Sequence, residues 1–138
     1  MNQFFDTLVL NAENKNLVDI TKYTNNFIDN SKVRNGLLNI SILHTSASLL
    51  IQENADKDVK TDLVYFFDLL VKEDKKFLHT KEGKDDMPAH IKTALTQTNL
   101  TISILHGKLK LGTWQGIFLF EHRINPRNRK ILMHIIGD

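Results

Sequence analysis

The chain contains no cysteine, which excludes disulfides and thiolate metal sites. Among its 138 residues are only two prolines, six glycines and one tryptophan, and no linker or low-complexity segment interrupts it. No apolar run is long enough to span a membrane, and the first residues lack the basic and apolar regions of a signal peptide. We therefore expect one cytoplasmic domain over residues 1–138, with no association with a membrane.

Neither sign of charge is in large excess in the sequence. The formal net charge of +2 is too small to argue for nucleic acid as a partner. A short basic cluster near the C-terminus can nevertheless hold a phosphate, and it consists of Arg123, Arg127, Arg129 and Lys130. We expect a phosphorylated small molecule as the partner.

Hydrophobic periodicity predicts an α+β domain with a mainly antiparallel sheet and about three helices. Helices are expected at residues 21–33, 56–71 and 85–97, with Thr21 and Asp56 as the caps of the first two. Strands are expected at residues 4–10, 16–20, 37–43, 48–52, 100–105, 108–111, 114–123 and 130–136.

Two of these strands carry further predictions. The alternation of residues 37–43, carried one step further, places His44 on the inward face of the sheet. Residues 131–136 are apolar at nearly every position, so both faces of the last strand should be buried. In so small a domain, another subunit can cover one of those faces.

Four of the six histidines lie in or beside polar motifs, at positions 44, 79, 90 and 122. His90 follows Asp86 by four residues, so the two side chains can share one face of a helix. Neutral imidazoles bind zinc and other divalent ions, which makes His44, His79 and His90, and less strongly His122, candidate metal ligands. Their spacing forms no local metal motif, so the fold must bring them together. The alternative for each is a hydrogen-bonded structural role.

Other residues offer complementary chemistry. Glu53 is either a site carboxylate or a turn cap, and Trp114 either stacks on a planar ring or belongs to the core. Gln115 can bind the edge of a pyrimidine, since its amide both donates and accepts hydrogen bonds. Arg123 and Arg129 match phosphate oxygens, although Arg123 can instead pair with Glu121.

The order of several motifs resembles the YjbQ family, formerly UPF0047, over essentially the whole chain. The motifs are HTSASL at 44–49, ENAD at 53–56, DDMPAHIK at 85–92, GTWQGI at 112–117, EHR at 121–123 and IGD at 136–138. The last motif departs from the family pattern, because Asp138 stands where a glutamate is usual.

The resemblance implies a homotrimer of α+β chains with sheets packed around a threefold axis. It also implies a secondary thiamine-phosphate synthase activity, which joins a pyrimidine methyl diphosphate to a thiazole phosphate and releases pyrophosphate. Together with side-chain chemistry it gives four candidate catalytic residues, His44, Glu53, Asp86 and His90. The candidate substrate-binding residues are Ser46, Lys92, Trp114, Gln115, Arg123 and Arg129.

Three classes of function remain open. A thiamine-phosphate synthase needs cations such as Arg123, Arg129 or Lys92, or a divalent ion, to neutralise the departing diphosphate. A metal-dependent hydrolase would use a histidine-bound Zn²⁺ or Mg²⁺, with Glu53 or Asp86 as the base. The third class is a non-catalytic trimeric module that binds a ligand or metal. No Gly-rich phosphate loop or nucleophile elbow decides among them.

Overall fold

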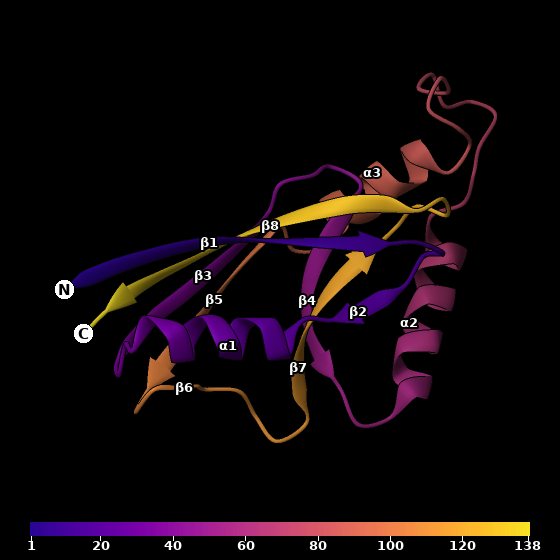
Figure 1. Cartoon of the computed structure of the whole chain (residues 1–138). Coiled ribbons are helices and arrows are strands. Elements are labelled where there is room, and N and C mark those ends of the chain that lie inside the picture. The colour runs from indigo at the N-terminus through magenta and orange to yellow at the C-terminus, as the bar shows by residue number, and fades with distance from the viewer.

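Eight strands form two antiparallel sheets in the computed structural model, which describes residues 1–138 (Figure 1). The larger sheet has the order β1 (Asn2–Ala12), β8 (Arg127–Gly137), β3 (Gly36–Ile42), β5 (Asn99–Leu105) and β6 (Lys108–Leu109). The smaller sheet has the order β2 (Leu17–Asp19), β7 (Gln115–Glu121) and β4 (Ala47–Glu53). The helices are α1 (Thr21–Ser31), α2 (Lys57–Leu70) and α3 (Asp86–Leu95), so the α+β prediction is confirmed.

The main core lies between the two sheets and α1. Alternate residues of β3 point inward, and Leu38, Ile40 and Ile42 are all buried, as their spacing predicts. Phe27 and Ile28 of α1 join the same hydrophobic cluster. Burial of apolar side chains from both sheets holds the layers together and fixes the positions of the strand ends.

A second, smaller cluster fixes α2 on the smaller sheet. The Phe67 ring packs edge-on against Phe120 of β7, with 5.4 Å between the ring centroids. Asp56 caps the helix as predicted, since its side chain accepts a hydrogen bond from the Asp58 amide at 2.9 Å. No residue of α2 is fully buried, however, and its exposed apolar side chains are Tyr65, Phe66, Leu69 and Leu70.

Three local predictions need correction. Thr21 is the first helical residue and not the cap, because Ile20 holds the cap position and the Asp19 carboxylate accepts the Thr21 amide proton. The helix ends at Ser31, before residue 33, since Lys32 adopts a left-handed conformation with φ of 62°. His44 lies beyond the end of β3 and is half-buried, so it does not continue the inward face of that strand.

The last strand, β8, is buried on one face only. Ile131, Met133 and Ile135 are at most 3% exposed and belong to the core. Leu132 and Ile136 on the other face are half-buried. Within the single chain, the prediction that both faces are buried is therefore correct for one face.

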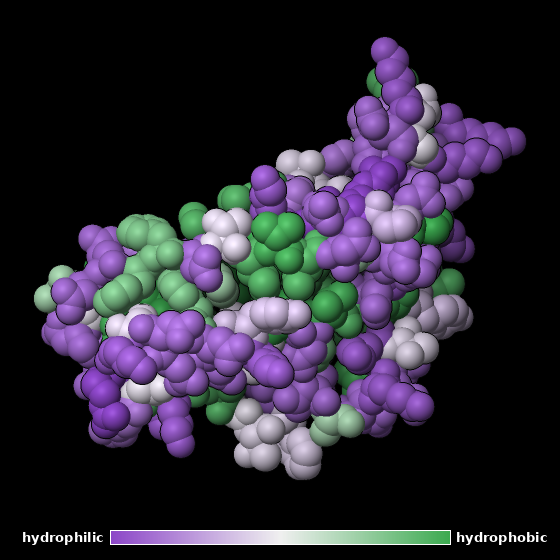
Figure 2. Space-filling model, viewed as in Figure 1, coloured by the Kyte–Doolittle hydropathy of each residue, from purple (hydrophilic) through white to green (hydrophobic).

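A long connection over residues 71–85 joins α2 to α3 and projects from the body of the molecule (Figure 1). The projection is mostly hydrophilic, whereas patches of hydrophobic side chains reach the surface over the body (Figure 2). None of the three helices is long and apolar enough to cross a membrane. The projecting connection and the first turns of α3 carry the groups described next.

Candidate metal centre

Two histidines and one aspartate meet at the start of α3. Asp86 is the first residue of the helix, His90 follows one turn later, and His79 comes from the projecting connection. The Asp86 Oδ2 atom lies 2.6 Å from His79 Nε2 and 3.1 Å from His90 Nε2. One ligand atom from each residue lies within 4.8 Å of the other two, so the three side chains can hold a single ion.

The backbone before β4 orients the His90 ring. His90 Nδ1 lies 2.8 Å from the Thr45 carbonyl oxygen, which only accepts, so Nδ1 carries a proton. The Nε2 atom then faces Asp86, another acceptor. Two states of the ring satisfy its contacts with Thr45 and Asp86 together. In one, both ring nitrogens are protonated; in the other, the ring is neutral and its Nε2 lone pair binds a cation that Asp86 also binds. A carbonyl that fixes the far nitrogen is typical of histidines that bind metals.

Arg123, just beyond the end of β7, holds the carboxylate from the other side. Its guanidinium donates to Asp86 Oδ1, to Asp85 Oδ2 at 3.0 Å and to the Glu82 carbonyl at 2.6 Å. Burial alone would raise the pKa of Asp86, but the hydrogen bond from His79 and the charges of Arg123 and His90 lower it below its usual value. The lowered pKa keeps the Asp86 carboxylate ionised although the residue is only 4% exposed, and the contacts of Arg123 orient it as a candidate ligand.

A cavity of about 520 Å³ adjoins His79. It is lined by the projecting connection, and its polar walls include Lys75, Lys84 and Thr80. Phe77 is its hydrophobic lining residue. The lining also includes the carboxylates of Glu73 and Asp74, so the cavity carries charges of both signs. Its volume suits a small molecule, and the two ammonium groups and the hydroxyl can contact an anionic part of it.

The donor set fits a divalent ion. Ligand atoms that lie about 2.0–2.2 Å from a tetrahedral ion are about 3.2–3.6 Å apart. The separation of His90 from Asp86 is already close to this range, while the shorter contact of His79 with Asp86 would have to widen. The His79 side chain is 44% exposed, which leaves it room to rotate. Two imidazoles and a carboxylate favour zinc over magnesium, because magnesium takes oxygen ligands.

The structure places His44 beside a different group of residues. His44 Nε2 accepts a hydrogen bond of 2.7 Å from the Lys130 amide, so its ring lies against β8. Burial, and then the positive charge of Arg129, lowers the pKa of His44. Arg129 itself is paired with Glu121 and donates to Ser46 Oγ at 3.0 Å. Arg129, Glu121 and Ser46 form a buried ion pair with its hydrogen-bond partner, and His44 lies near it, outside the cluster of candidate metal ligands.

Two further candidates are buried inside the fold. Lys92 is 2% exposed, and its ammonium contacts Asp68 Oδ1 at 2.5 Å. His122 is 1% exposed, and its Nε2 atom lies 2.9 Å from Ser48 Oγ. Neither residue reaches the three candidate metal ligands.

The remaining candidates lie at the opposite end of the smaller sheet. Glu53 pairs with Gln115 across β4 and β7, whereas Ala47 at the other end pairs with Glu121. Six residue steps separate the two ends, or about 20 Å. Trp114 is 62% exposed beside this far end and is not a core residue. Within one chain, the predicted site residues therefore fall into separate groups.

Two features of the site have no pattern in the sequence that identifies them. Thr45 contributes through its carbonyl, which any residue type could provide. Lys75 and Lys84 line the cavity beside His79, yet they occur in a polar connection where lysines are common. Only the folded chain shows that these groups converge.

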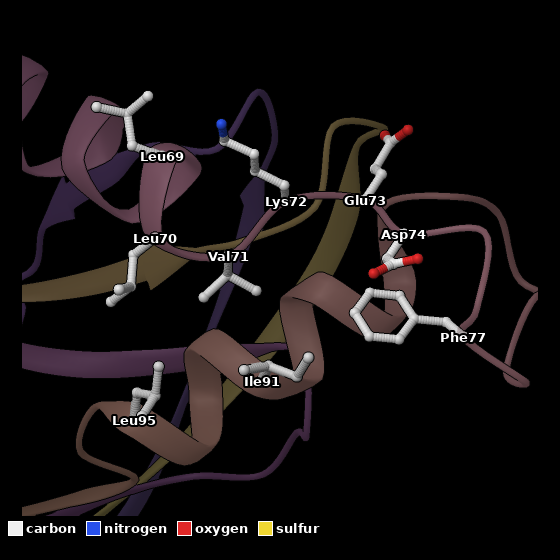
Figure 3. Close-up of a pocket in the computed structure, with 9 residues that line it drawn as sticks. All are labelled: Leu69, Leu70, Val71, Lys72, Glu73, Asp74, Phe77, Ile91 and Leu95. Carbon is white, nitrogen blue, oxygen red and sulfur yellow. The ribbon is translucent and has the colours of Figure 1, made fainter.

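The largest cavity in the molecule is apolar and is a separate feature. It has a volume of about 650 Å³ and lies between the end of α2, the residues that follow it and α3 (Figure 3). Leu69, Leu70, Ile91, Leu95 and Phe77 provide most of its hydrophobic lining. It contains no histidine, and its apolar character suits packing more than chemistry.

Fold and site together define an α+β domain with a two-histidine, one-carboxylate cluster beside β4. A family model described as UPF0047 protein YjbQ-like matches residues 6–138, and the chain belongs to this family. A UPF0047 protein of Synechocystis is 47% identical over 137 residues, which are 99% of this chain and 93% of the relative. A UPF0047 protein of Methanocaldococcus jannaschii is 46% identical over 122 residues, with coverages of 88% and 86%.

Solved structures agree with the fold. An uncharacterized conserved protein of the yjbq/upf0047 family from Clostridium acetobutylicum is 36% identical, with a TM-score of 0.88. The match covers 95% of this chain and 99% of that one. A YbjQ-like protein of unknown function from Sulfolobus solfataricus has a TM-score of 0.90 at 24% identity, covers 99% of both chains and supports the fold alone.

Proposed function

We propose that the protein is a zinc-dependent enzyme that acts on a phosphorylated small molecule. The observation that carries the proposal is the convergence of His79, Asp86 and His90 within 4.8 Å. Thr45 orients one imidazole and Arg123 orients the carboxylate, which is the support that metal ligands require. Three protein ligands leave an open position, as catalytic zinc sites do.

The ion would take part in the chemistry, and the side chains that line the adjoining cavity would bind the substrate. A bound ion would supply a Lewis acid and lower the pKa of a coordinated water. Lys75 and Lys84 would donate to phosphate oxygens in the adjoining cavity, whose lining also includes Glu73 and Asp74. Phe77 would cover the apolar part of the substrate.

Hydrolysis of a phosphate ester or anhydride fits this geometry best. Arg129, which the sequence favours as a phosphate ligand, is already paired with Glu121, and Lys92 is buried away from the three candidate metal ligands. Glu53 and Trp114, which could stabilise the cation of a thiamine-phosphate synthase, lie at the other end of the smaller sheet. The synthase reaction implied by the family resemblance is the second candidate, since the ion and two lysines could also stabilise a departing diphosphate.

One assay separates the two reactions. The zinc-loaded protein is given the pyrimidine methyl diphosphate, alone or with the thiazole phosphate, and phosphate, pyrophosphate and thiamine phosphate are measured. Hydrolysis releases phosphate or pyrophosphate without the thiazole, whereas the synthase releases pyrophosphate only with it and forms thiamine phosphate. A panel of other small phosphate esters extends the hydrolase arm.

A matched pair of variants links turnover to the metal centre. His90→Asn should lower turnover about 100-fold or more, because it removes a ligand. His106→Asn, at an exposed histidine outside the site, should leave turnover unchanged. Equal turnover in the two folded variants, or no turnover in any arm, would refute the proposal.

We also propose that the chain acts as a homotrimer. The supporting observations are the exposed apolar side chains of α2 and the half-buried outer face of β8. Apolar patches of this kind mark contacts between subunits.

A further inference from the structure

A second polar cavity, of about 370 Å³, opens on another face of α3. Asp85, Pro88 and Lys92 are spaced three and four residues apart, so they share a face that differs from that of Asp86 and His90. We call this cavity the Lys92 pocket. Its other lining residues are Lys15, Asp68, Val71, Lys72, Glu73 and His122.

The ammonium groups of the Lys92 pocket have unused donors. Lys92 has a side chain only 3% exposed, and its ammonium contacts a single oxygen of Asp68. The Lys15 ammonium contacts the same oxygen at 3.2 Å. Each ammonium group has three N–H donors, but both groups contact the same oxygen of Asp68. Some of their donors therefore have no partner, and one carboxylate does not balance two positive charges. A buried charge in this state favours an additional anionic partner.

His122 adds an unpartnered polar atom to this wall. The residue is 1% exposed, and its Nδ1 atom is buried without a hydrogen-bond partner. Such atoms are uncommon in folded proteins. Burial, and then the charges of Lys92 and Arg129, lowers the pKa of His122 to about 3, so the ring is neutral near pH 7.

A chain of hydroxyl groups can set the tautomer of this ring. Thr96 Oγ1 lies 2.6 Å from Ser48 Oγ, which lies 2.9 Å from His122 Nε2. Thr96 Oγ1 also lies 2.8 Å from the Lys92 carbonyl oxygen, which only accepts, so Thr96 donates there. Ser48 then donates to Thr96 and accepts from His122 Nε2, which leaves the Nδ1 lone pair as a free acceptor in this wall.

We propose that the Lys92 pocket binds the oxyanion group, phosphate or carboxylate, of a small molecule. Lys92 and Lys15 are the donors, and His122 Nδ1 accepts a hydrogen bond from a protonated oxygen of the bound group. Asp85, the N-cap of α3, is paired with Arg123 and does not add free negative charge. The other lining carboxylates, Asp68 and Glu73, face three ammonium groups, those of Lys15, Lys72 and Lys92. The cavity is separate from the metal centre, and the excess of ammonium donors disfavours a cation there.

The pocket is tested with inorganic phosphate and, separately, with acetate. The readout is the ¹⁵N NMR signal of the His122 ring, which reports on this pocket alone. We expect a saturable shift with at least one anion, and the tighter anion identifies the group. Lys92→Met and Lys15→Met should each weaken binding about 10- to 100-fold, because each removes a charged donor.

Three controls complete the experiment. Lys108→Met makes the same charge change at an exposed lysine of β6 and should leave the titration unchanged. His90→Asn removes a candidate metal ligand and should also leave it unchanged, which separates this pocket from the proposed enzyme site. Lys15→Met decides the outcome if Lys92→Met does not fold. The inference is overturned if neither anion saturates the signal, if the lysine variants bind like the wild type, or if His90→Asn alone abolishes binding.

Discussion

His122 is held in a setting that keeps its imidazole neutral. Its ring contacts Ser48 on one side, and burial together with the charges of Lys92 and Arg129 opposes protonation. The unfolded chain imposes no such constraint, so an unfolded histidine titrates near pH 6.5. The difference makes the stability of the fold depend on pH.

The direction of that dependence follows from the lowered pKa. Between about pH 6.5 and the folded pKa of about 3, the unfolded chain binds a proton at His122 and the folded chain does not. The free energy of unfolding should therefore fall as the pH drops below 6.5, by up to about 1.4 kcal/mol per pH unit from this residue. Asp68, Asp85 and Asp86 have lowered pKa values, so their contributions decline only at more acidic pH.

Urea denaturation from pH 7 to pH 4.5 measures this effect. His122→Phe keeps the aromatic packing on Phe120 and should flatten the slope. The same slope in the variant and the wild type would rule out His122 as the source. The protein concentration must stay fixed, since association also changes apparent stability.

Some of the individual contacts in the candidate site can be predicted from the sequence. The four-residue spacing of Asp86 and His90 predicts that they share a helix face. In the structure, His90 Nε2 lies 3.1 Å from Asp86 Oδ2. The inclusion of His79 depends on the path of the connection before α3, which no periodicity encodes. The ion pair of Arg129 with Glu121 likewise depends on the pairing of distant strands.

At the scale of elements, Arg123 joins three parts of the chain. It follows β7, and its guanidinium reaches both aspartates at the start of α3 and the Glu82 carbonyl of the projecting connection. The residue is 6% exposed, so these contacts are made away from water. Removal of the guanidinium would leave two largely buried carboxylates without their cation.

Arg123→Met should therefore lower the free energy of unfolding by about 3–5 kcal/mol. Arg127→Met is the control, because Arg127 is half-buried and its side chain contacts only the Asn125 carbonyl. Urea denaturation curves of both variants give the comparison. A loss in Arg123→Met no larger than that in the control would show that the contacts do not hold α3 in place.

The elements themselves were largely predictable. Strands such as β3 follow from strict alternation, and α2 follows from apolar spacing and the Asp56 cap. The predicted start of α1 at residue 21 is correct, but the cap position belongs to Ile20 and not to Thr21. The Asp19 carboxylate accepts the hydrogen bond from the Thr21 amide, although a threonine at 21 is itself a typical cap. The outward apolar face of α2 was not foreseen, since periodicity cannot tell whether a helix packs on its own sheet or on a neighbour.

At the scale of the whole molecule, a group of large apolar side chains on α2 remains exposed within the single chain. Tyr65, Phe66, Leu69 and Leu70 of α2 are 49–63% exposed. The apolar cavity between α2 and α3 continues this surface through Leu69 and Leu70 (Figure 3). A monomer rarely leaves so many large apolar side chains together in water.

We expect a homotrimer with about three times the chain mass of 15.9 kDa. Phe66→Glu with Leu70→Glu should shift the protein toward monomer, because charges would be buried in the contact. Leu78→Glu, at a side chain 99% exposed on the projecting connection, should leave the trimer intact. Sedimentation equilibrium measures all three proteins, and a wild-type mass near that of one chain would contradict the proposal.

Zinc binding is the most direct test of the proposed metal centre. Isothermal titration of the metal-free protein with Zn²⁺ should give one site per chain in the wild type and in His106→Asn. His79→Asn and His90→Asn should each weaken binding about 10-fold or more, because each removes one of three ligands. Stoichiometric binding that His79→Asn and His90→Asn leave unchanged, or no zinc binding by the folded wild-type protein, would contradict the account.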